Sequence, residues 1–262
     1  MTTDAAAAYS VTGGAWQEGP GRIYDRLAEV LAARCPVPLK GCRVLDVGAG
    51  TGAVTRAVLG AGASGVVAID VALGMLAYDA ARRPPAVVGD AVALPFDRST
   101  FDAAVAAFSL NHLAAPADGL REMARVTRPG GALLAAAYAT DDTHPVKAAV
   151  EDALAARGWS PQPWYAALRT EVTPLMATVE GCAAAAKGAG LDARVELIRV
   201  PFPELDRSHL IDWRLGMAQH APFLTRLSPD DRAAVSADAL ARLGDATEPL
   251  VRSILVLQAI RT

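Results

Sequence analysis

The sequence predicts an α/β protein built on a mostly parallel sheet with helices on both faces. Short apolar segments, typical of buried strands, alternate with helical segments from residue 43 onward. A glycine-rich loop joins the first of these strands to the next helix, as in Rossmann-like folds that bind ligands at the carboxyl edge of the sheet. The chain has 262 residues, enough for one large domain.

The predicted elements follow in a regular order. Apolar residues at helical spacing predict a helix in 22–34, which Pro36 and Pro38 end. Apolar runs predict strands at 43–47, 65–70, 86–88, 101–109 and 131–138. Helices are predicted between them at 52–60, 72–82 and 117–127. Farther along, the pattern predicts a helix at 177–189, a strand at 194–200 that is broken by "PFP", a helix at 208–221 and a last strand at 253–260.

We interpret residues 1–262 as a single domain with additions to its sheet. The core is expected at about 37–140 and 191–262, and an N-terminal lid at about 1–35. Cap insertions are expected at about 141–190 and 202–250, over the carboxyl edge. The first cap contains Trp159, Trp164 and Tyr165 among prolines, which predicts either the wall of an apolar cleft or plain packing.

Composition narrows the possible partners. A formal net charge of −3 lacks the basic footprint of a nucleic-acid-binding protein. No apolar run of 18 residues or more predicts a membrane span, and the first ten residues do not resemble a signal peptide, so a cytoplasmic protein is expected. Cys35, Cys42 and Cys182 lack metal-ligand spacing, so we expect reduced thiols and no metal site. A monomer and a homodimer remain equally open.

The glycine-rich loop fits two kinds of cofactor. Gly48, Gly50 and Ala53 satisfy the dinucleotide fingerprint, and Asp70 lies where that fingerprint expects an acid for the ribose. Against a dinucleotide, Asp46 lies in the strand just before the loop, where a carboxylate would repel a pyrophosphate. Asp90 adds a third acid at the end of a third strand. Three acids at successive strand ends suit a cationic adenosine ligand better than an anionic one.

At these residues the sequence resembles the class I S-adenosylmethionine-dependent methyltransferases, of the small-molecule, type 11-like kind. The segments "VLDVGAGTG", "VVAIDVALGML", "GDAVALPFDRSTFDAAVAAFSLNHL" and "LREMARVTRPGGALL" resemble that family's motifs in order and spacing over about 40–140. The resemblance implies a seven-stranded, mostly parallel sheet whose last strand is antiparallel, with an α-helical cap. It also implies S-adenosyl-L-methionine as the cofactor.

Roles for individual residues follow from the same resemblance. The glycines would line the amino-acid part of the cofactor. Asp46 would hold its ammonium group, directly or through a water molecule, and Asp70 would bind its ribose hydroxyls. Met75 would pack on the adenine, and Asp90 and Ala91 would bind the amino edge of that ring. The complete set of cofactor-binding positions expected is Tyr9, Tyr24, Asp46, Gly48, Ala49, Gly50, Gly52, Asp70, Val71, Met75, Asp90, Ala91, Phe108 and Ser109.

Two histidines are the catalytic candidates. His112 follows the fourth strand, and its alternative role is to order the backbone near the cofactor. His144 follows the fifth strand beside Asp141 and Asp142, and its alternative is a structural or capping role. His220 is expected in a packed helix face, with a place in the pocket wall as the alternative.

The sequence thus predicts a methyltransferase that acts on a small, partly apolar acceptor of the specialised-metabolite type. Its cap, which matches no family pattern, is expected to select the acceptor. One alternative is a protein that binds the cofactor without transferring methyl, as a cyclisation catalyst or a regulatory binder. The other alternative is a nicotinamide-dependent dehydrogenase.

Overall fold

A seven-stranded sheet runs through the molecule in the order β3-β2-β1-β4-β5-β7-β6. The computed structural model describes residues 2–245 and 248–262. The strands are β1 (Arg43–Val47), β2 (Gly65–Asp70), β3 (Ala86–Val88), β4 (Phe101–Ala107), β5 (Thr127–Tyr138), β6 (Ala193–Phe202) and β7 (Leu250–Ile260). Pairs among β1 to β5 are parallel, whereas β7 is antiparallel to both β5 and β6. The predicted fold class is therefore confirmed.

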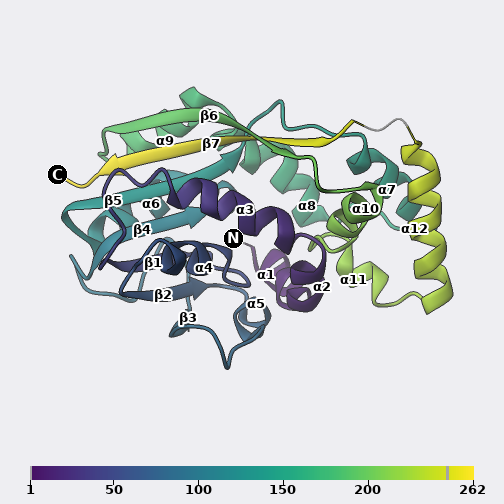
Figure 1. Ribbon diagram of the computed structural model, residues 1–262, viewed down its shortest axis with the longest axis horizontal. Helices are drawn as coiled ribbons and strands as arrows, with labels where there is room; N and C mark the ends of the chain where they lie inside the picture. The colour runs from purple at the N-terminus through teal and green to yellow at the C-terminus, as the bar shows by residue number, and fades with distance from the viewer. Residues whose placement is uncertain (1, 246–247) are drawn as a thin grey trace.

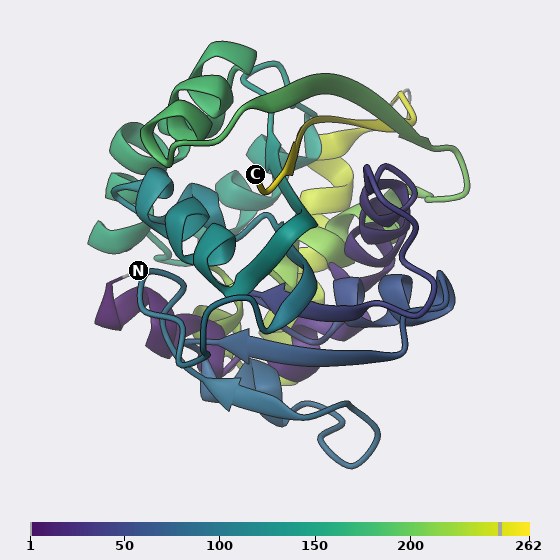
Figure 2. The same cartoon turned by 90° about the vertical axis from the view of Figure 1, so that its left-hand side faces the viewer.

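Helices cover both faces of this sheet (Figures 1 and 2). Successive strand residues point to opposite faces, so that Val44 joins one core cluster and Leu45 the other. The first cluster packs under α3 (Gly21–Ala32) and α4 (Ala53–Gly60), and the second under α6 (Pro116–Val126) and α9 (Val179–Gly188). Two separate apolar cores thus hold the sheet between helix layers.

The remaining helices gather beyond the carboxyl ends of the parallel strands, from the middle to the right of Figure 1. They are α1 (Thr3–Ser10), α2 (Gly13–Glu18), α5 (Leu73–Ala77), α7 (Val146–Ala155), α8 (Pro163–Ala167), α10 (Arg207–Leu215), α11 (Ala221–Leu224) and α12 (Pro229–Leu243). Short turns η1 (Leu110–His112), η2 (Leu168–Val172) and η3 (Thr173–Met176) lie between them in the chain. The lid and cap segments expected from the sequence include residues 1, 246 and 247, which lie outside the described residues.

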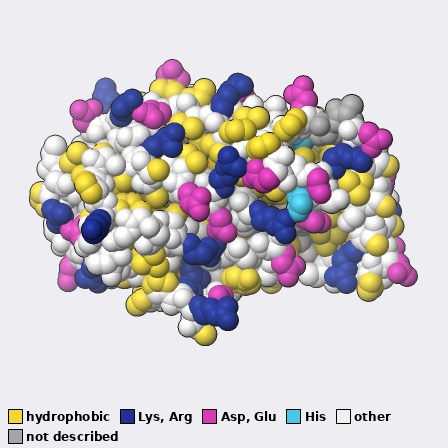
Figure 3. All heavy atoms as spheres, in the orientation of Figure 1, with side chains coloured by type: hydrophobic (Ala, Val, Ile, Leu, Met, Phe, Trp, Pro, Cys, Tyr) yellow, Lys and Arg dark blue, Asp and Glu magenta, His cyan; other side chains and the backbone are white. Residues whose placement is uncertain are grey.

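The distribution of surface charge and the length of the helices relate to the expected absence of nucleic-acid and membrane partners. Basic and acidic side chains are interspersed on the face shown in Figure 3. Within the described ranges, no helix combines the length and the apolar character needed to cross a bilayer.

Two predicted helices end well before their expected last residues. The helix expected at 72–82 ends at Ala77, where the Arg83 guanidinium folds back and donates to the carbonyls of Met75 (3.2 Å) and Leu76 (2.8 Å). The helix expected at 208–221 ends at Leu215. A Cβ on Gly216 would lie 2.5 Å from the Ala15 carbonyl oxygen, so the N-terminal segment packs against this turn.

Several strand boundaries also differ from the predictions, and β5 and β7 begin earlier than expected, at Thr127 and Leu250. The strand expected at 101–109 ends at Ala107, because Phe108 adopts a left-handed backbone with φ of 56°. The strand expected to break at "PFP" continues through Phe202, with Pro201 paired to Val251. β6 is an edge strand with one unpaired side, where a residue without an N–H is tolerated.

A buried ion pair joins the segment after β5 to strand β7. Asp142 accepts two hydrogen bonds from the Arg252 guanidinium, at 2.8 and 2.7 Å, and a third from the Ser253 amide at 3.0 Å. Both charged residues are almost fully buried. The Arg252 guanidinium also stacks on Tyr138, 3.9 Å from its ring centre, and on Trp213 at 4.6 Å. This pair fixes the first cap segment to the sheet.

Removing the buried carboxylate should therefore cost far more stability than removing its neighbour. We expect Asp142→Ala to lower the free energy of unfolding by about 3–5 kcal/mol, because Arg252 would remain buried and unpaired. Asp141 pairs with Arg199 on the surface, and Asp141→Ala should cost less than about 1 kcal/mol. Urea unfolding of both variants and the parent measures the difference. Equal losses in the two variants would contradict the proposed importance of the buried pair.

Candidate functional site

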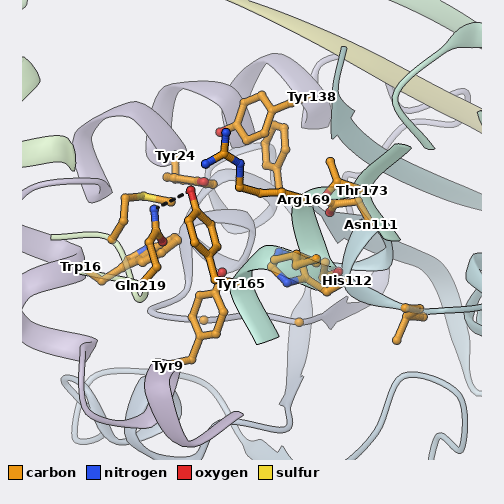
Figure 4. A pocket seen from close by; sticks show the side chains of 18 of the residues that line it. Tyr9, Trp16, Tyr24, Asn111, His112, Tyr138, Tyr165, Arg169, Thr173 and Gln219 are labelled. Carbon is orange, nitrogen blue, oxygen red and sulfur yellow. Dashed lines mark hydrogen bonds between the residues drawn. The ribbon is translucent and has the colours of Figure 1, made fainter. Parts of the chain in front are cut away.

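A cavity of about 750 Å³ opens at the carboxyl edge of the sheet. Its wall combines sheet loops with the N-terminal helices and the cap (Figure 4). Most of the site residues expected from the sequence line it, namely Tyr9, Tyr24, Gly48, Ala49, Gly50, Asp70, Val71, Met75, Asp90, Ala91, Phe108, Ser109, His112 and His144. Asp46 and Gly52 were also expected, but they are not among the lining residues.

The loop after β1 lies against its neighbours too closely for side chains. Gly48 has φ of +71°, and a Cβ there would lie 2.2 Å from the Ser109 Cβ. Ser109 in turn donates from its hydroxyl to the Val47 carbonyl at 2.7 Å. Gly50 also has a positive φ, and Gly52, at φ of +93°, forms the N-cap of α4. Gly48 and Gly50 therefore let bare backbone approach a ligand.

Asp70, at the end of β2, holds this loop in place. One carboxylate oxygen accepts from the Gly50 amide and the other from the Ala72 amide, both at 2.8 Å. Burial raises the pKa of Asp70, and these two amides oppose that rise. Each oxygen keeps a further lone pair, so the carboxylate can also accept hydrogen bonds from a ligand's hydroxyl groups.

Asp46 lies beneath the loop and is not among the residues that line the cavity. Its Oδ2 atom accepts from both the amide and the hydroxyl of Thr55, at 2.9 and 2.6 Å. The side chain thereby binds an otherwise unpaired amide in the first turn of α4, and Oδ1 is buried without a partner in the described structure. Direct contact of Asp46 with a cofactor ammonium is not supported, because the carboxylate lies under the loop and outside the cavity wall.

The next strand ends complete the same side of the cavity. Met75 is buried with Trp16 and Ala72, and its methyl carbon would lie 3.3 Å from a Cβ on Gly50. Asp90 accepts from the Val92 amide at 3.2 Å and leaves its other oxygen without a recorded partner among the described residues. Val71 and Ala91 line the cavity beside these acids.

The sequence analysis missed Arg83, which binds the backbone beside these residues. Its guanidinium donates to the Gly50 carbonyl at 3.2 Å, in addition to the two carbonyls at the end of α5. Burial lowers the pKa of Arg83, and the nearby Asp46 and Asp70 carboxylates oppose that change. The arginine has no local motif that could have indicated this role, because its partners lie in two other segments.

Phe108 and Ser109 follow β4 at the centre of the cavity wall. Phe108 stacks on Tyr138, with ring centres 4.4 Å apart, and meets Tyr24 edge-on at 5.5 Å. A left-handed φ is costly for a bulky residue and is most often retained at functional sites. The aromatic contacts over-determine this conformation, and they connect the sheet to α3.

His112 lies beside Asn111 on the next turn of the same segment. Burial lowers the pKa of His112 to about 4, so its imidazole is neutral at pH 7. Nδ1 is buried with no partner in the described structure, and the same holds for Oδ1 of Asn111. The ring meets Tyr9 of α1 edge-on, with centres 5.6 Å apart. His112 is thus an uncharged side chain in the cavity wall whose Nδ1 makes no hydrogen bond in the described structure.

His144 also lines the cavity, but both of its ring nitrogens are occupied. Nδ1 accepts from the Val146 amide at 3.2 Å, and Nε2 faces the Glu248 carbonyl at 3.1 Å. With Nε2 protonated, the neutral ring caps the start of α7 and ties it to the chain before β7. These contacts favour the capping alternative over a catalytic base. His220 is fully buried against Trp159 and bonded to the Arg214 carbonyl at 2.7 Å.

Aromatic and charged side chains from the cap make up the rest of the wall. Trp164 and Tyr165 line it from α8, as one of the two sequence interpretations expected. Apart from Asp142, which it named beside His144, the sequence analysis missed the polar members of the wall: Asn111, Asp142, Lys147, Glu151, Arg169, Arg214, Gln219 and Arg252. Hydropathy patterns could not reveal them, because the packing of separate helices, strands and loops brings these residues together.

The buried carboxylate of Asp46 makes stability depend on pH. Burial raises the pKa of Asp46 from 3.8 to about 6, despite the bonds from Thr55. A folded-state pKa above the unfolded value gives stability that is complete below about pH 4 and is lost as the pH rises through 6. Asp46→Asn cannot titrate. We expect its unfolding free energy, relative to the parent, to rise by roughly 2–3 kcal/mol from pH 4 to pH 8. Urea unfolding at both pH values tests this, and a constant difference would contradict it.

Sequence comparison finds relatives for the central part of the chain. Residues 45–135 match the methyltransferase domain family. The demethylmenaquinone methyltransferase of Mycolicibacterium gilvum is 40% identical over 140 residues, which is 53% of this chain and 59% of that protein. The protein of the same name from Renibacterium salmoninarum is 44% identical over 140 residues, 53% of this chain and 57% of its own. The match therefore covers less than two thirds of either relative.

Solved structures share the fold at low sequence identity. A Haloferax volcanii protein in complex with the methyltransferase activator Trm112 has a TM-score of 0.60 at 19% identity, covering 100% of this chain and 99% of its own. A Haemonchus contortus phosphoethanolamine N-methyltransferase with bound S-adenosyl-L-methionine has a TM-score of 0.56 at 18% identity, and the match covers 90% of this chain and 52% of that one. The [4+2]-cyclase SpnF has a TM-score of 0.54 at 23% identity, and the match covers 90% of this chain and 80% of that one. Residues 45–135 are therefore similar to the methyltransferase domain family, and the chain shares the fold of these solved structures.

Proposed function

We propose that this protein transfers a methyl group from S-adenosylmethionine to a small, partly apolar acceptor of the specialised-metabolite type. The observation that carries this proposal is the two-part wall of a single cavity. One part is the glycine loop with Asp70 and Asp90, and the other is aromatic and belongs to the N-terminal helices and the cap. A donor and an acceptor bound in these two parts would meet near Phe108.

The first part fits the cofactor chemically. Asp70 and Asp90 present carboxylate oxygens to the cavity, which suits a ligand with a positive charge and several hydroxyl groups. Gly48 and Gly50 present bare backbone to the cavity, since a Cβ on Gly48 would clash with Ser109 and a Cβ on Gly50 would touch Met75. Asp70 would bind the ribose hydroxyls, Met75 would contact the adenine and Asp90 its amino edge. Asp70 would suit the ribose of a dinucleotide as well, so the discrimination against a nicotinamide cofactor rests on Asp90 and on the match of residues 45–135 to the methyltransferase domain family.

The second part fits an aromatic or otherwise apolar acceptor. Its lining includes Tyr9, Trp16, Tyr24, Tyr138 and Trp164. Together with Phe108 and His112 they form a continuous series of ring contacts, with centres between 4.4 and 6.4 Å apart. The curated relatives are named for a quinone substrate, which is likewise a flat ring system with apolar character. This likeness supports a ring-bearing acceptor.

The chain's contribution to the reaction is alignment and exclusion of water. S-adenosylmethionine, when bound, supplies both the methyl group and the leaving group for an in-line displacement. Holding donor and acceptor in line can account for roughly 7–11 kcal/mol of a barrier. α1 and α2 place Tyr9 and Trp16 on the cavity wall and act as a lid, while the cap closes the opposite side.

His112 would accept a hydrogen bond from the acceptor's reacting hydroxyl group. The imidazole is neutral at pH 7 and reaches the cavity beside Asn111, so it can orient a hydroxyl and draw its proton away as the new bond forms. A base with a pKa of about 4 is too weak to ionise a phenol in advance. His112 therefore acts chiefly by positioning.

The alternative function is cofactor binding without methyl transfer. One structural neighbour is named a [4+2]-cyclase, so the fold itself does not require transfer. Incubation with radiolabelled S-adenosylmethionine and a panel of phenols and quinols separates the two functions. Label in a product supports methyl transfer. Tight binding of S-adenosylhomocysteine with no labelled product supports the alternative, and binding of NAD in its place contradicts both.

Loss of the His112 ring should slow the reaction without weakening cofactor binding. We expect His112→Gln to lower kcat about tenfold or more and to leave the affinity for S-adenosylhomocysteine unchanged. Because His112 is neutral throughout, the parent's kcat should stay flat from pH 6 to pH 8 with respect to this group. His209→Gln, at the exposed start of α10, is the matched control. A kcat that is unchanged in His112→Gln would rule out the assigned role.

A further inference from the structure

Two carboxylates in the cavity wall are each shared by two cations. Asp142 pairs with Arg252, and also accepts from Lys147 Nζ at 3.1 Å. Glu151 pairs with Arg214 at 3.3 Å and with Arg169 at 3.4 Å. Lys147 and Glu151 stand four residues apart on α7, so they lie on the same face of that helix. Both groups of charges therefore meet along one side of the cavity.

The Glu151 group is loosely bonded. Its contacts with Arg214 and Arg169 are long, and so is the third, in which the Tyr165 hydroxyl donates to Glu151 at 3.3 Å. Gln219 continues this chain with a bond of 3.4 Å to the Tyr165 hydroxyl, drawn as the dashed line in Figure 4. Charge-assisted hydrogen bonds are normally 2.7–2.9 Å, so about half an ångström separates these groups from full pairing.

Positive charge is therefore left over on this side of the cavity. Lys147, Arg169, Arg214 and Arg252 line it against Asp142 and Glu151 alone at that end. Arg214 and Arg252 are only 5% and 3% exposed, and Arg214 Nε and Arg252 Nη1 have no partner in the described structure. Burial lowers the pKa of Lys147, and the nearby Arg252 and Arg214 lower it further, while Asp142 opposes the change. Buried cations without sufficient counter-charge are costly, and a bound anion would offset that cost.

We infer that the acceptor carries a carboxylate group, which binds beside α7 between Lys147, Arg169 and Arg214. This inference rests on the proposed function for the identity of the ligand as an acceptor. The cavity has opposite charge at its two ends, since Asp70 and Asp90 line the other one. An acidic acceptor would therefore enter with its carboxylate toward α7 and its ring among the aromatic side chains. Arginine is well suited to this role, because its fork matches the two carboxylate oxygens.

Matched ligands that differ only in charge test this inference. The probes are benzoate, 1-naphthoate and 2-naphthoate, each compared with its primary amide by calorimetry in a phosphate-free buffer. The parent is titrated alone and again with saturating S-adenosylhomocysteine. We expect at least one acid to bind about tenfold more tightly than its amide. Equal affinity within every pair, or no binding of any acid, would overturn the inference.

Variants connect the preference to the assigned residues. Arg169→Gln and Lys147→Gln should each reduce the preference for the acid several-fold and leave the affinity for the amide unchanged. More than half of the Arg169 side chain and a third of the Lys147 side chain are exposed, so the fold should tolerate both changes. Arg194→Gln, on the outer edge strand, is the control and should retain the full preference. A preference that survives in both cavity variants would place the anion elsewhere.

The two proposals fail in different ways. Failure to bind S-adenosylhomocysteine would contradict the proposed function, whereas the difference between acid and amide is still measured on the protein alone. Normal binding of S-adenosylhomocysteine with no preference for acids would overturn only the carboxylate inference.

Discussion

The close approach of the loop after β1 to the segment after β4 is the constraint on which the rest of the site depends. Gly48 lies against Ser109 with no room for a Cβ, and Ser109 is tied to the carbonyl of Val47. The loop can then reach Asp70, whose carboxylate accepts from Gly50 and Ala72 and joins the ends of β1 and β2. Three strand ends are thereby fixed relative to one another, and Phe108 is placed beside the same loop. Any enlargement at Gly48 would displace both halves of the cavity together.

Much of the sheet could be predicted from the sequence, because the relevant signals are local. The apolar runs of β1, β2 and β3 coincide with their predicted ranges, and the glycine loop lies where its spacing placed it. The errors arise where a distant residue decides a boundary. Arg83 shortens α5 by binding its last carbonyls, and the packing of Ala15 against Gly216 ends α10. Neither contact has a periodic signature, so hydropathy patterns do not reveal it.

The polar half of the site was beyond the reach of the sequence for the same reason. Asp142 and Arg252 are 110 residues apart, yet they form the buried pair that fixes the cap. Asp46 shows how far a motif reaches. It lies near the end of β1 as expected, and Thr55 donates two hydrogen bonds to Oδ2, whereas Oδ1 has no partner in the described structure. A position in a motif fixes where the backbone lies, whereas the partner of a side chain depends on which neighbour is nearer.

Several of the buried polar groups that have no partner in the described structure belong to residues lining the cavity. Asn111 and His112 leave a buried oxygen and a buried nitrogen without partners beside Phe108, which itself holds an unfavourable φ. Arg214 leaves a guanidinium nitrogen unpaired at the opposite end. Each of these costs folding free energy, and together they would destabilise a cavity that had no ligand to satisfy them. Binding of an acceptor with a hydroxyl at one end and a charged group at the other would satisfy both ends at once. Discrimination then follows without a tight steric fit, because a compound that lacks either group leaves buried partners unpaired.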